Sequence, residues 1–217
     1  MSSTSILCTT TDPGRTDGWD KPVNQSLEHR KELKRYDIPG HAHALTFSCY
    51  HRRSYFDDPI ACEVFLGVLN EARELYEYKL WAYVVMPNHV HVLLWPMRLT
   101  YDIAKICGGL KGVASKRYHN HLMENDPLRR DGLLVRAGGK NVFRFWQHGG
   151  GFDRNLWKAD AVHDVIRYIE ANPVRRKLVD IPEQYRWSSA YARATNQEPV
   201  PDRFGMPVTP SHGRRSC

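Results

Sequence analysis

Two histidines stand on either side of a single valine, in the order His89, Val90, His91. Residues two apart on a β-strand point to the same face of a sheet, so an extended backbone presents both imidazoles together. Neutral imidazole is a common ligand of divalent metal ions, and two on one face form half of a metal site. Two surface or core histidines without a ligand would show the same spacing, so the pair alone does not establish a metal.

A second chemically suggestive pair lies in a segment with helical periodicity. Tyr168 and Asn172 are four residues apart and therefore share one side of a helix, next to an apolar stripe suited to packing on a sheet. A tyrosine hydroxyl has an ordinary pKa of about 10, so it needs help to act as a nucleophile at neutral pH. A half-buried structural tyrosine is the alternative for Tyr168, and helix termination before Pro173 is the alternative for Asn172.

Tyr118 is the rival nucleophile, because it also lies on a predicted helix beside basic residues. The residue one helical turn later is Leu122, which cannot bind a metal. Because its basic neighbours suit an anionic partner such as DNA, we interpret Tyr118 as a surface or DNA-contacting residue.

The elements that must position these residues alternate along the chain. Apolar alternation in residues 44–50 predicts a strand, and Asp58 followed by Pro59 predicts the start of a helix. The pattern favours an α+β fold with an antiparallel sheet, of ferredoxin-like or RRM-like plan, and with the helices packed on one face. The expected order is strand, helix, hairpin, helix, short strand and helix, at residues 44–50, 57–75, 80–95, 102–122, 141–146 and 160–171.

The two ends of the chain differ in composition from its centre. Residues 1–35 are polar and end in a basic run, and residues 192–217 are polar and proline-rich. We expect a flexible basic N-terminal arm, a single functional domain over residues 36–191 and a flexible C-terminal tail.

The composition indicates a basic globular protein with an anionic partner. The 31 Lys and Arg residues exceed the 24 Asp and Glu residues and give a formal net charge of +7, which favours nucleic acid as the partner. The five cysteines are scattered without a Cys-x-x-Cys pair, which suits a reducing cytoplasm, and no apolar run is long enough to cross a membrane. Trp146 and Trp157 are candidates to stack on unpaired bases, with core packing as the alternative. The predicted phosphate-contacting residues are Arg52, Arg53, Lys111, Lys116, Arg117, Arg154, Arg175 and Arg176.

Four separate motifs resemble one family of enzymes. Residues 84–93 (VVMPNHVHVL) resemble the His-hydrophobic-His motif of single-tyrosine transposases. The segments 145–147 (FWQ) and 167–175 (RYIEANPVR) resemble two further motifs of that group, and 187–189 (WSS) fits the one that usually follows. The most similar subgroup is the REP-associated tyrosine transposases, and the similarity runs in collinear order over residues 36–191.

This resemblance implies a role for each site residue. His89, His91 and the side-chain oxygen of Asn172 hold a divalent metal ion, Mg²⁺ or Mn²⁺, and Tyr168 attacks the scissile phosphate. The implied product is a 5′-phosphotyrosine with a free 3′-hydroxyl. Another 3′-hydroxyl end can later attack this phosphotyrosine, be joined to the 5′ phosphate and release the tyrosine. The implied partner is single-stranded DNA with hairpin-forming repeats, and the protein is expected to be a monomer or a homodimer.

Two other functions are compatible with parts of the pattern. A non-catalytic RRM-like domain would need basic and aromatic residues on its sheet, but no coincidence of histidine, tyrosine and asparagine. A metal hydrolase would use His89 and His91 with a third ligand from a nearby Asp or Glu. A covalent protein–DNA adduct would distinguish the transposase from the RRM-like domain, and activity that survives the loss of Tyr168 would favour the hydrolase.

Overall fold

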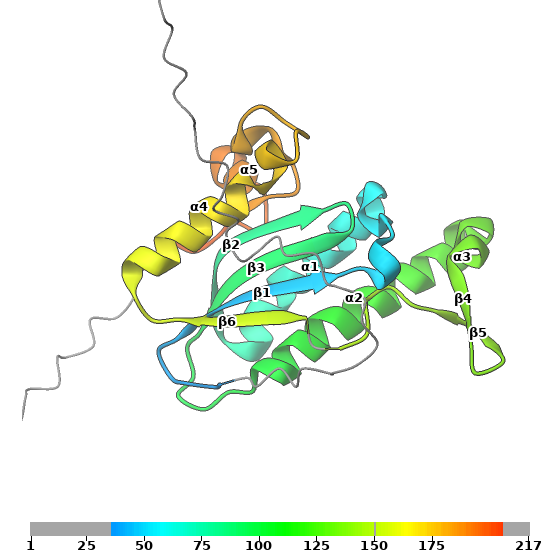
Figure 1. The fold of residues 1–217 in the computed structure, drawn as a ribbon, viewed down its shortest axis with the longest axis horizontal. Helices are drawn as coiled ribbons and strands as arrows, with labels where there is room; N and C mark the ends of the chain where they lie inside the picture. Colours follow the sequence, from blue (N-terminus) through cyan, green and yellow to red (C-terminus); the bar gives the residue numbers. More distant parts are fainter. Residues whose placement is uncertain (1–35, 150, 206–217) are drawn as a thin grey trace, which may run out of the picture. The chain divides into compact units, whose positions relative to one another are not determined.

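The computed structural model describes residues 36–149 and 151–205, and its centre is a four-stranded antiparallel sheet. The strand order is β2-β3-β1-β6 (Figure 1). Chain order and strand order together are those of a ferredoxin-like βαββαβ unit, which confirms the α+β fold predicted from the sequence. The strands are β1 (Ala42–Ser48), β2 (Tyr78–Met86), β3 (His89–Pro96) and β6 (Phe152–Leu156).

Two long helices cover one face of this sheet. The first, α1 (Pro59–Tyr76), begins where the sequence predicted, because the Asp58 carboxylate accepts a hydrogen bond from the backbone N–H of Ile60 and Pro59 fills the first turn. The second, α2 (Ile103–Asn125), is capped by Asp102 in the same way. Alternate strand residues pack against these helices and form the main core, among them Leu45, Phe47, Val90, Val92 and Leu94.

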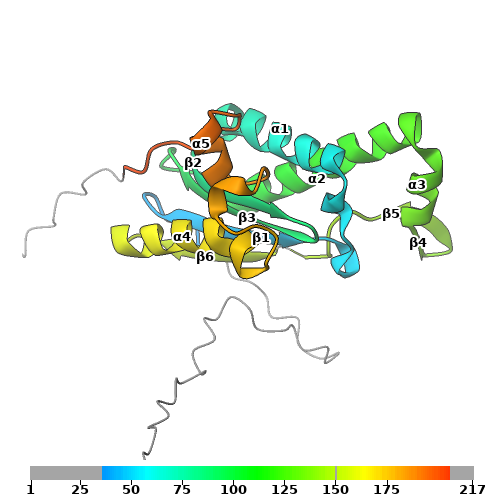
Figure 2. The same cartoon turned by 90° about the horizontal axis from the view of Figure 1, so that it is seen from above.

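A third helix, α4 (Ala159–Arg175), lies on the opposite face of the sheet, where it packs against β2 and β3 (Figure 2). The prediction that the helices pack on one face is therefore correct for α1 and α2 but wrong for α4. The apolar stripe of α4 needs a surface to cover. Small and apolar residues of β1 and β2, such as Ala44, Ala82 and Val84, lie on the second face and are also buried.

The segment between α2 and the last strand of the sheet forms an additional arm. It contains α3 (Pro127–Leu133) and a two-stranded hairpin of β4 (Leu134–Ala137) and β5 (Lys140–Phe143). The strand predicted at residues 141–146 is thus β5 of this hairpin and does not belong to the main sheet. The fourth strand of the main sheet is β6, which pairs with β1 and was not predicted.

The chain beyond α4 folds back onto β2. It forms a short 3-10 helix, η3 (Pro182–Gln184), and then α5 (Ser189–Thr195). Asp202 accepts hydrogen bonds from Arg73 and from the backbone N–H of Leu80. Residues 196–205 are therefore not a free tail, although the sequence predicted one from residue 192. The predicted arm at 1–35 and the last residues, 206–217, lie outside the described part of the chain.

Candidate active site

The two histidines lie at the beginning of β3, directly after the tight turn at Pro87 and Asn88. Val90 points into the core beneath α1 and α2, so His89 and His91 point to the opposite face, the one covered by α4. Their ring centroids are 4.9 Å apart and the rings are nearly perpendicular. The structure therefore brings both imidazoles together on one face, as the spacing predicted.

Each imidazole is held through its Nδ1 atom. His91 Nδ1 is 2.8 Å from the Thr46 hydroxyl, and His89 Nδ1 is 2.7 Å from the Asn88 side-chain oxygen. An amide oxygen only accepts, so His89 Nδ1 carries the proton and its Nε2 keeps a lone pair. The Thr46 hydroxyl can accept a hydrogen bond from His91 Nδ1–H in the same way, which makes Nε2 of both rings the natural ligand atom.

The protonation of His91 also suits a metal ligand. Its side chain is only 6% exposed. Burial lowers the pKa of His91 to about 3, and the nearby charge of His89 adds to this effect. At neutral pH the ring of His91 is therefore neutral, which is the form that binds metal ions.

Tyr168 meets the histidines from α4, across the second face of the sheet. Its ring centroid is 5.8 Å from that of His91, at an interplanar angle of 79°. The guanidinium of Arg175 lies over the Tyr168 ring, 4.8 Å from its centroid. A strand and a helix that are far apart in sequence thus place a phenol, two imidazoles and a guanidinium in one region.

Asn172 is buried and lies one turn after Tyr168. Its side-chain N–H donates to the Tyr168 backbone carbonyl over 2.8 Å, which leaves the side-chain oxygen for other interactions. The helix continues through Pro173 to Arg175. Asn172 does not end the helix, so the structural alternative for this residue, helix termination, is wrong.

The orientation of α4 is fixed by contacts that the sequence did not reveal. The Glu170 carboxylate accepts hydrogen bonds from the Ser189 hydroxyl, over 2.6 Å, and from Arg193 of α5. The Trp187 carbonyl accepts from the backbone N–H of Val85 on β2, over 2.8 Å. The WSS motif therefore anchors the α4–α5 unit to the sheet. Thr46 was also missed, although its place opposite the apolar face of its strand was a usable signal.

Tyr118, the rival nucleophile, is a core residue. It is 1% exposed and its hydroxyl donates to the Asp58 carboxylate over 2.8 Å. Burial and this hydrogen bond raise the pKa of Tyr118, which makes the nucleophilic phenolate harder to form. The interpretation of Tyr118 as a surface or DNA-contacting residue is therefore wrong.

The predicted phosphate-contacting residues divide between the two faces. Arg154 lies on β6 opposite Ala44, on the face that carries the histidines. Arg175 and Arg176 end α4 on the same side, and both help to lower the pKa of His91. Arg52 and Arg53 lie in and directly after the 3-10 helix η1 (Tyr50–Arg52), close to the turn that precedes His89.

The three remaining basic residues lie on α2, which covers the other face. Lys111 donates to the Gly149 carbonyl. Arg117 forms two hydrogen bonds of 2.7 Å with the Glu71 carboxylate on α1. Lys116 is exposed near them. The fold thus separates these three side chains from the histidines.

The two candidate stacking tryptophans also differ in position. Trp146 packs against the core and donates its indole N–H to the Lys111 carbonyl. Trp157 is 60% exposed and stacks on His41, with ring centroids 5.4 Å apart. Core packing, the favoured alternative for both, is therefore correct for Trp146 and wrong for Trp157.

The described residues hold no group of three or more His, Cys, Asp or Glu side chains that could bind a metal. A hydrolase built on His89 and His91 would need such a carboxylate, so this alternative lacks its third ligand within residues 36–149 and 151–205.

In the same part of the chain, no helix is both long enough and apolar enough to cross a membrane.

Comparison with known proteins bears on the fold and on the first half of the domain. Residues 39–131 match the family profile described as "Transposase IS200 like". The fold is similar to that of a REP-associated tyrosine transposase solved with a REP hairpin, with a TM-score of 0.59 and 16% identity over 86% of this chain and 98% of that one. A candidate transposase from Deinococcus radiodurans R1 aligns with 67% of this chain and 96% of its own, at 19% identity, but its TM-score of 0.39 is too low to bear on the fold. No curated protein matches the sequence.

Proposed function

We propose, starting from the match of residues 39–131 to the IS200-like transposase profile, that the chain cuts and rejoins single-stranded DNA with Tyr168 as nucleophile. The observation that carries the proposal is the contact between His91 and Tyr168, whose ring centroids are 5.8 Å apart. The His-hydrophobic-His motif lies inside the matched residues, whereas Tyr168 lies outside them. Its approach to the motif from a separate helix is therefore independent support.

The donor atoms of the histidine pair fit a divalent metal ion, Mg²⁺ or Mn²⁺. Both rings are held at Nδ1, which directs the Nε2 lone pairs to a ligand, and His91 is neutral at neutral pH. We propose the side-chain oxygen of Asn172 as the third ligand. A bound metal would polarise the phosphate oxygens and offset negative charge in the transition state.

The protein side of the reaction follows from the residues around Tyr168. The phenolic oxygen forms a bond to phosphorus and loses its proton, while the bond from phosphorus to the 3′ oxygen breaks and that oxygen leaves as a 3′-hydroxyl. The Arg175 guanidinium beside the ring stabilises negative charge on the phenol. A 3′-hydroxyl from the same or another strand can reverse the step, because the phosphoester bond is kept in the adduct.

The substrate we propose is single-stranded DNA with a hairpin-forming repeat. The REP-associated transposase of similar fold was solved with a hairpin, and the basic residues at the end of α4 suit a phosphate backbone. Two further predictions are that the protein is a monomer or a homodimer and that it resides in the cytoplasm.

The test is incubation with end-labelled hairpin DNA and Mn²⁺, followed by denaturing electrophoresis of protein and DNA together. We expect cut DNA and a protein band shifted by covalently attached DNA, both absent with EDTA. The matching perfect duplex should stay intact. DNA binding without any adduct would instead favour the non-catalytic RRM-like alternative.

Asn172 can be tested separately from the histidines. Asn172→Asp keeps an oxygen ligand and should retain metal binding and part of the cleavage, whereas Asn172→Leu should lose most of the cleavage. Both variants lose the side-chain donor to the Tyr168 carbonyl, so this structural cost is matched between them. Normal cleavage by Asn172→Leu would remove Asn172 from the metal site and leave the two histidines.

A further inference from the structure

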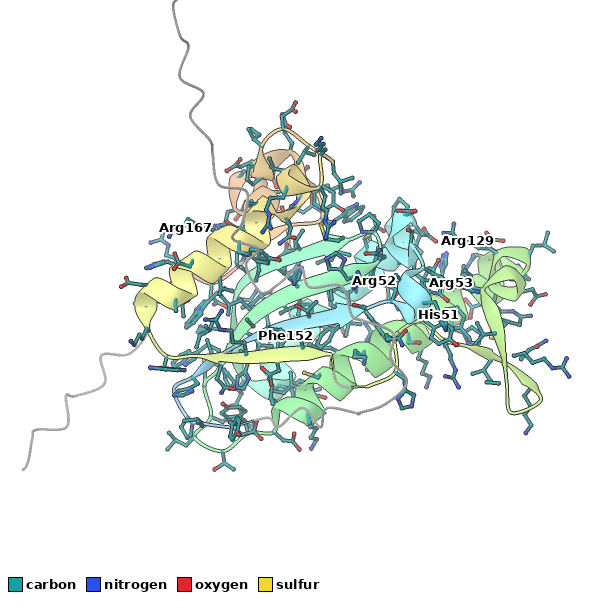
Figure 3. All side chains as sticks on the ribbon, in the orientation of Figure 1. His51, Arg52, Arg53, Arg129, Phe152 and Arg167 are labelled. Carbon is teal, nitrogen blue, oxygen red and sulfur yellow. The ribbon has the colours of Figure 1, made fainter. Side chains whose placement is uncertain are left out.

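A pocket of about 300 Å³ lies outside the histidine–tyrosine region, beside α3. Its opposite wall is the segment that leads from η1 into the 3-10 helix η2 (Tyr55–Asp57). Two guanidinium groups line it, those of Arg53 and Arg129, and Figure 3 labels both residues. The lining residues are Arg53, Ser54, Tyr55, Arg129, Gly132 and Leu133.

The pocket keeps an excess of positive charge. Arg53 donates to the Leu133 carbonyl over 3.2 Å, which orients the guanidinium without neutralising it. Within the described residues, Arg53 forms no ion pair. Arg129 lies 3.5 Å from the Asp58 carboxylate, and its side chain is 41% exposed. Arg129 thus has a carboxylate partner, whereas Arg53 contacts only a neutral carbonyl in the printed hydrogen bond, and this pair leaves capacity for an anion of the size and charge of a phosphodiester.

The pocket is tied structurally to the beginning of β3. The backbone N–H of Cys49 donates to the Asn88 carbonyl over 2.9 Å, and that of Phe56 donates to the Pro87 carbonyl over 3.0 Å. The segment that carries Arg53 thus forms hydrogen bonds with the turn immediately before His89. An anion in the pocket would be held in a fixed relation to the histidines.

We infer that this pocket binds the phosphodiester backbone of the duplex stem of a DNA hairpin. The inference rests on the proposed function for the choice of DNA. A stem suits the site better than a single strand, because Tyr55, the aromatic residue of the lining, is 2% exposed and offers no surface for base stacking. The adjoining β4–β5 hairpin is a two-stranded ribbon with exposed Arg136 and Lys140, and such a ribbon fits the major groove of a duplex.

Gly132 permits a test that removes no native contact. A Cβ atom added there meets no heavy atom within 4 Å, and its backbone needs no left-handed conformation. Gly132→Glu therefore introduces a carboxylate into the pocket, and Gly132→Gln is the control of equal size without charge. Arg53→Ala with Arg129→Ala tests the same site by removal. All are made together with Tyr168→Phe, so that binding is measured without cleavage.

Binding is measured by fluorescence anisotropy at several salt concentrations, with three probes: a hairpin with a single-stranded extension, the blunt stem alone, and the extension alone. We expect Gly132→Glu and the double arginine variant to weaken hairpin and stem binding on the order of tenfold or more. The slope of log affinity against log salt should fall by about one for each lost phosphate contact. Gly132→Gln should bind as the parent does.

Three results would overturn the inference: parent-like stem binding by Gly132→Glu, a loss confined to the extension probe, or no hairpin binding by the parent. Covalent cleavage by the protein with Tyr168 intact is scored in a separate assay. If stem binding depends on the pocket but the protein with Tyr168 intact forms no adduct, the proposed function is contradicted and the pocket assignment is still supported.

Discussion

Each face of the sheet carries a buried histidine, and the two differ in how their ring nitrogens are used. His43, under α1 and α2, has both nitrogens occupied, one by Asp153 at 2.9 Å and the other by Tyr101 at 2.8 Å. His91, under α4, is bonded to Thr46 through Nδ1, and its ring faces His89 and Tyr168. A histidine with both nitrogens satisfied has no atom left for a ligand, whereas one held by a single nitrogen is positioned to use the other.

The two tyrosines repeat this contrast. Tyr118 points into the core and its hydroxyl is committed to Asp58. Tyr168 is only partly buried and lies against His91 and Arg175. In sequence both follow an arginine on a helix, and only the residue one turn later, Leu122 or Asn172, distinguished them. The face on which each helix packs decides which tyrosine is available for chemistry.

The largest expected effect separates the two tyrosines. Tyr168→Phe should abolish the adduct and all measurable cleavage while hairpin binding stays intact, because no other hydroxyl replaces the attacking atom. Tyr118→Phe should still cleave, but should lower the free energy of unfolding by about 1–3 kcal/mol through the lost buried hydrogen bond. Adduct gels and urea titrations measure the two properties. If Tyr168→Phe still cleaved DNA, Tyr168 would not be the nucleophile. If Tyr118→Phe lost cleavage while fully folded, Tyr118 would take that role.

Substitutions of the histidines on the two faces should also have different effects. His91→Ala and His89→Ala should lose metal-dependent cleavage, since one imidazole with one amide oxygen leaves too few protein ligands. His43→Ala should cleave normally per folded molecule but unfold more easily, by at least about 1 kcal/mol, because its hydrogen bonds to Asp153 and Tyr101 are lost. If His43→Ala lost cleavage while remaining folded, the division of the sheet into a chemical and a structural face would fail.

A smaller effect is expected at Thr46, which orients His91 without touching a ligand. Thr46→Val keeps the shape of the side chain and removes the acceptor for His91 Nδ1. Loss of such a supporting hydrogen bond typically costs about 10–100-fold in metal affinity or activity. The Mn²⁺ concentration for half-maximal cleavage should rise accordingly, with hairpin binding in EDTA unchanged. An unaltered Mn²⁺ requirement would show that Thr46 is only a packing residue.

The sequence predicted the parts of the fold that carry strong local signals. Alternation identified β1, the cap at Asp58 identified the start of α1, and the His-x-His spacing placed two imidazoles on one face. Local patterns fail where the determining interaction is distant. The β6 sequence, FDRNL, lacks apolar alternation because one of its faces is largely exposed, and only pairing with β1 makes it a strand.

The position of α4 shows a second limit of sequence reasoning. Proline disfavours helix in the residue before it, yet α4 continues through Pro173, which is buried together with Asn172. Tertiary packing outweighs the local preference. The apolar stripe of α4 is visible in the sequence, but nothing in a stripe tells which face of the sheet it will cover. For this reason the covering of the second face by α4 could not be predicted. The same limit applies to α2, where the sequence did not tell that the side carrying Tyr118 packs into the core.

The smallest expected effect tests the two-face division on the basic residues. Arg117 was predicted to contact phosphate, but its guanidinium makes two hydrogen bonds to Glu71 on the α1–α2 side, and both partners are about half exposed. Removing the Arg117 side chain should therefore change the free energy of unfolding by less than about 1 kcal/mol.

Arg117→Ala should also leave hairpin affinity and its salt dependence nearly unchanged, because the side chain lies on the face away from the histidines. Arg175→Ala is the matched comparison, since it removes the same charge from beside Tyr168 and should lower the salt slope by about one. Equal losses in the two variants would mean that DNA wraps both faces, and the assignment of α2 to a purely structural role would then be wrong.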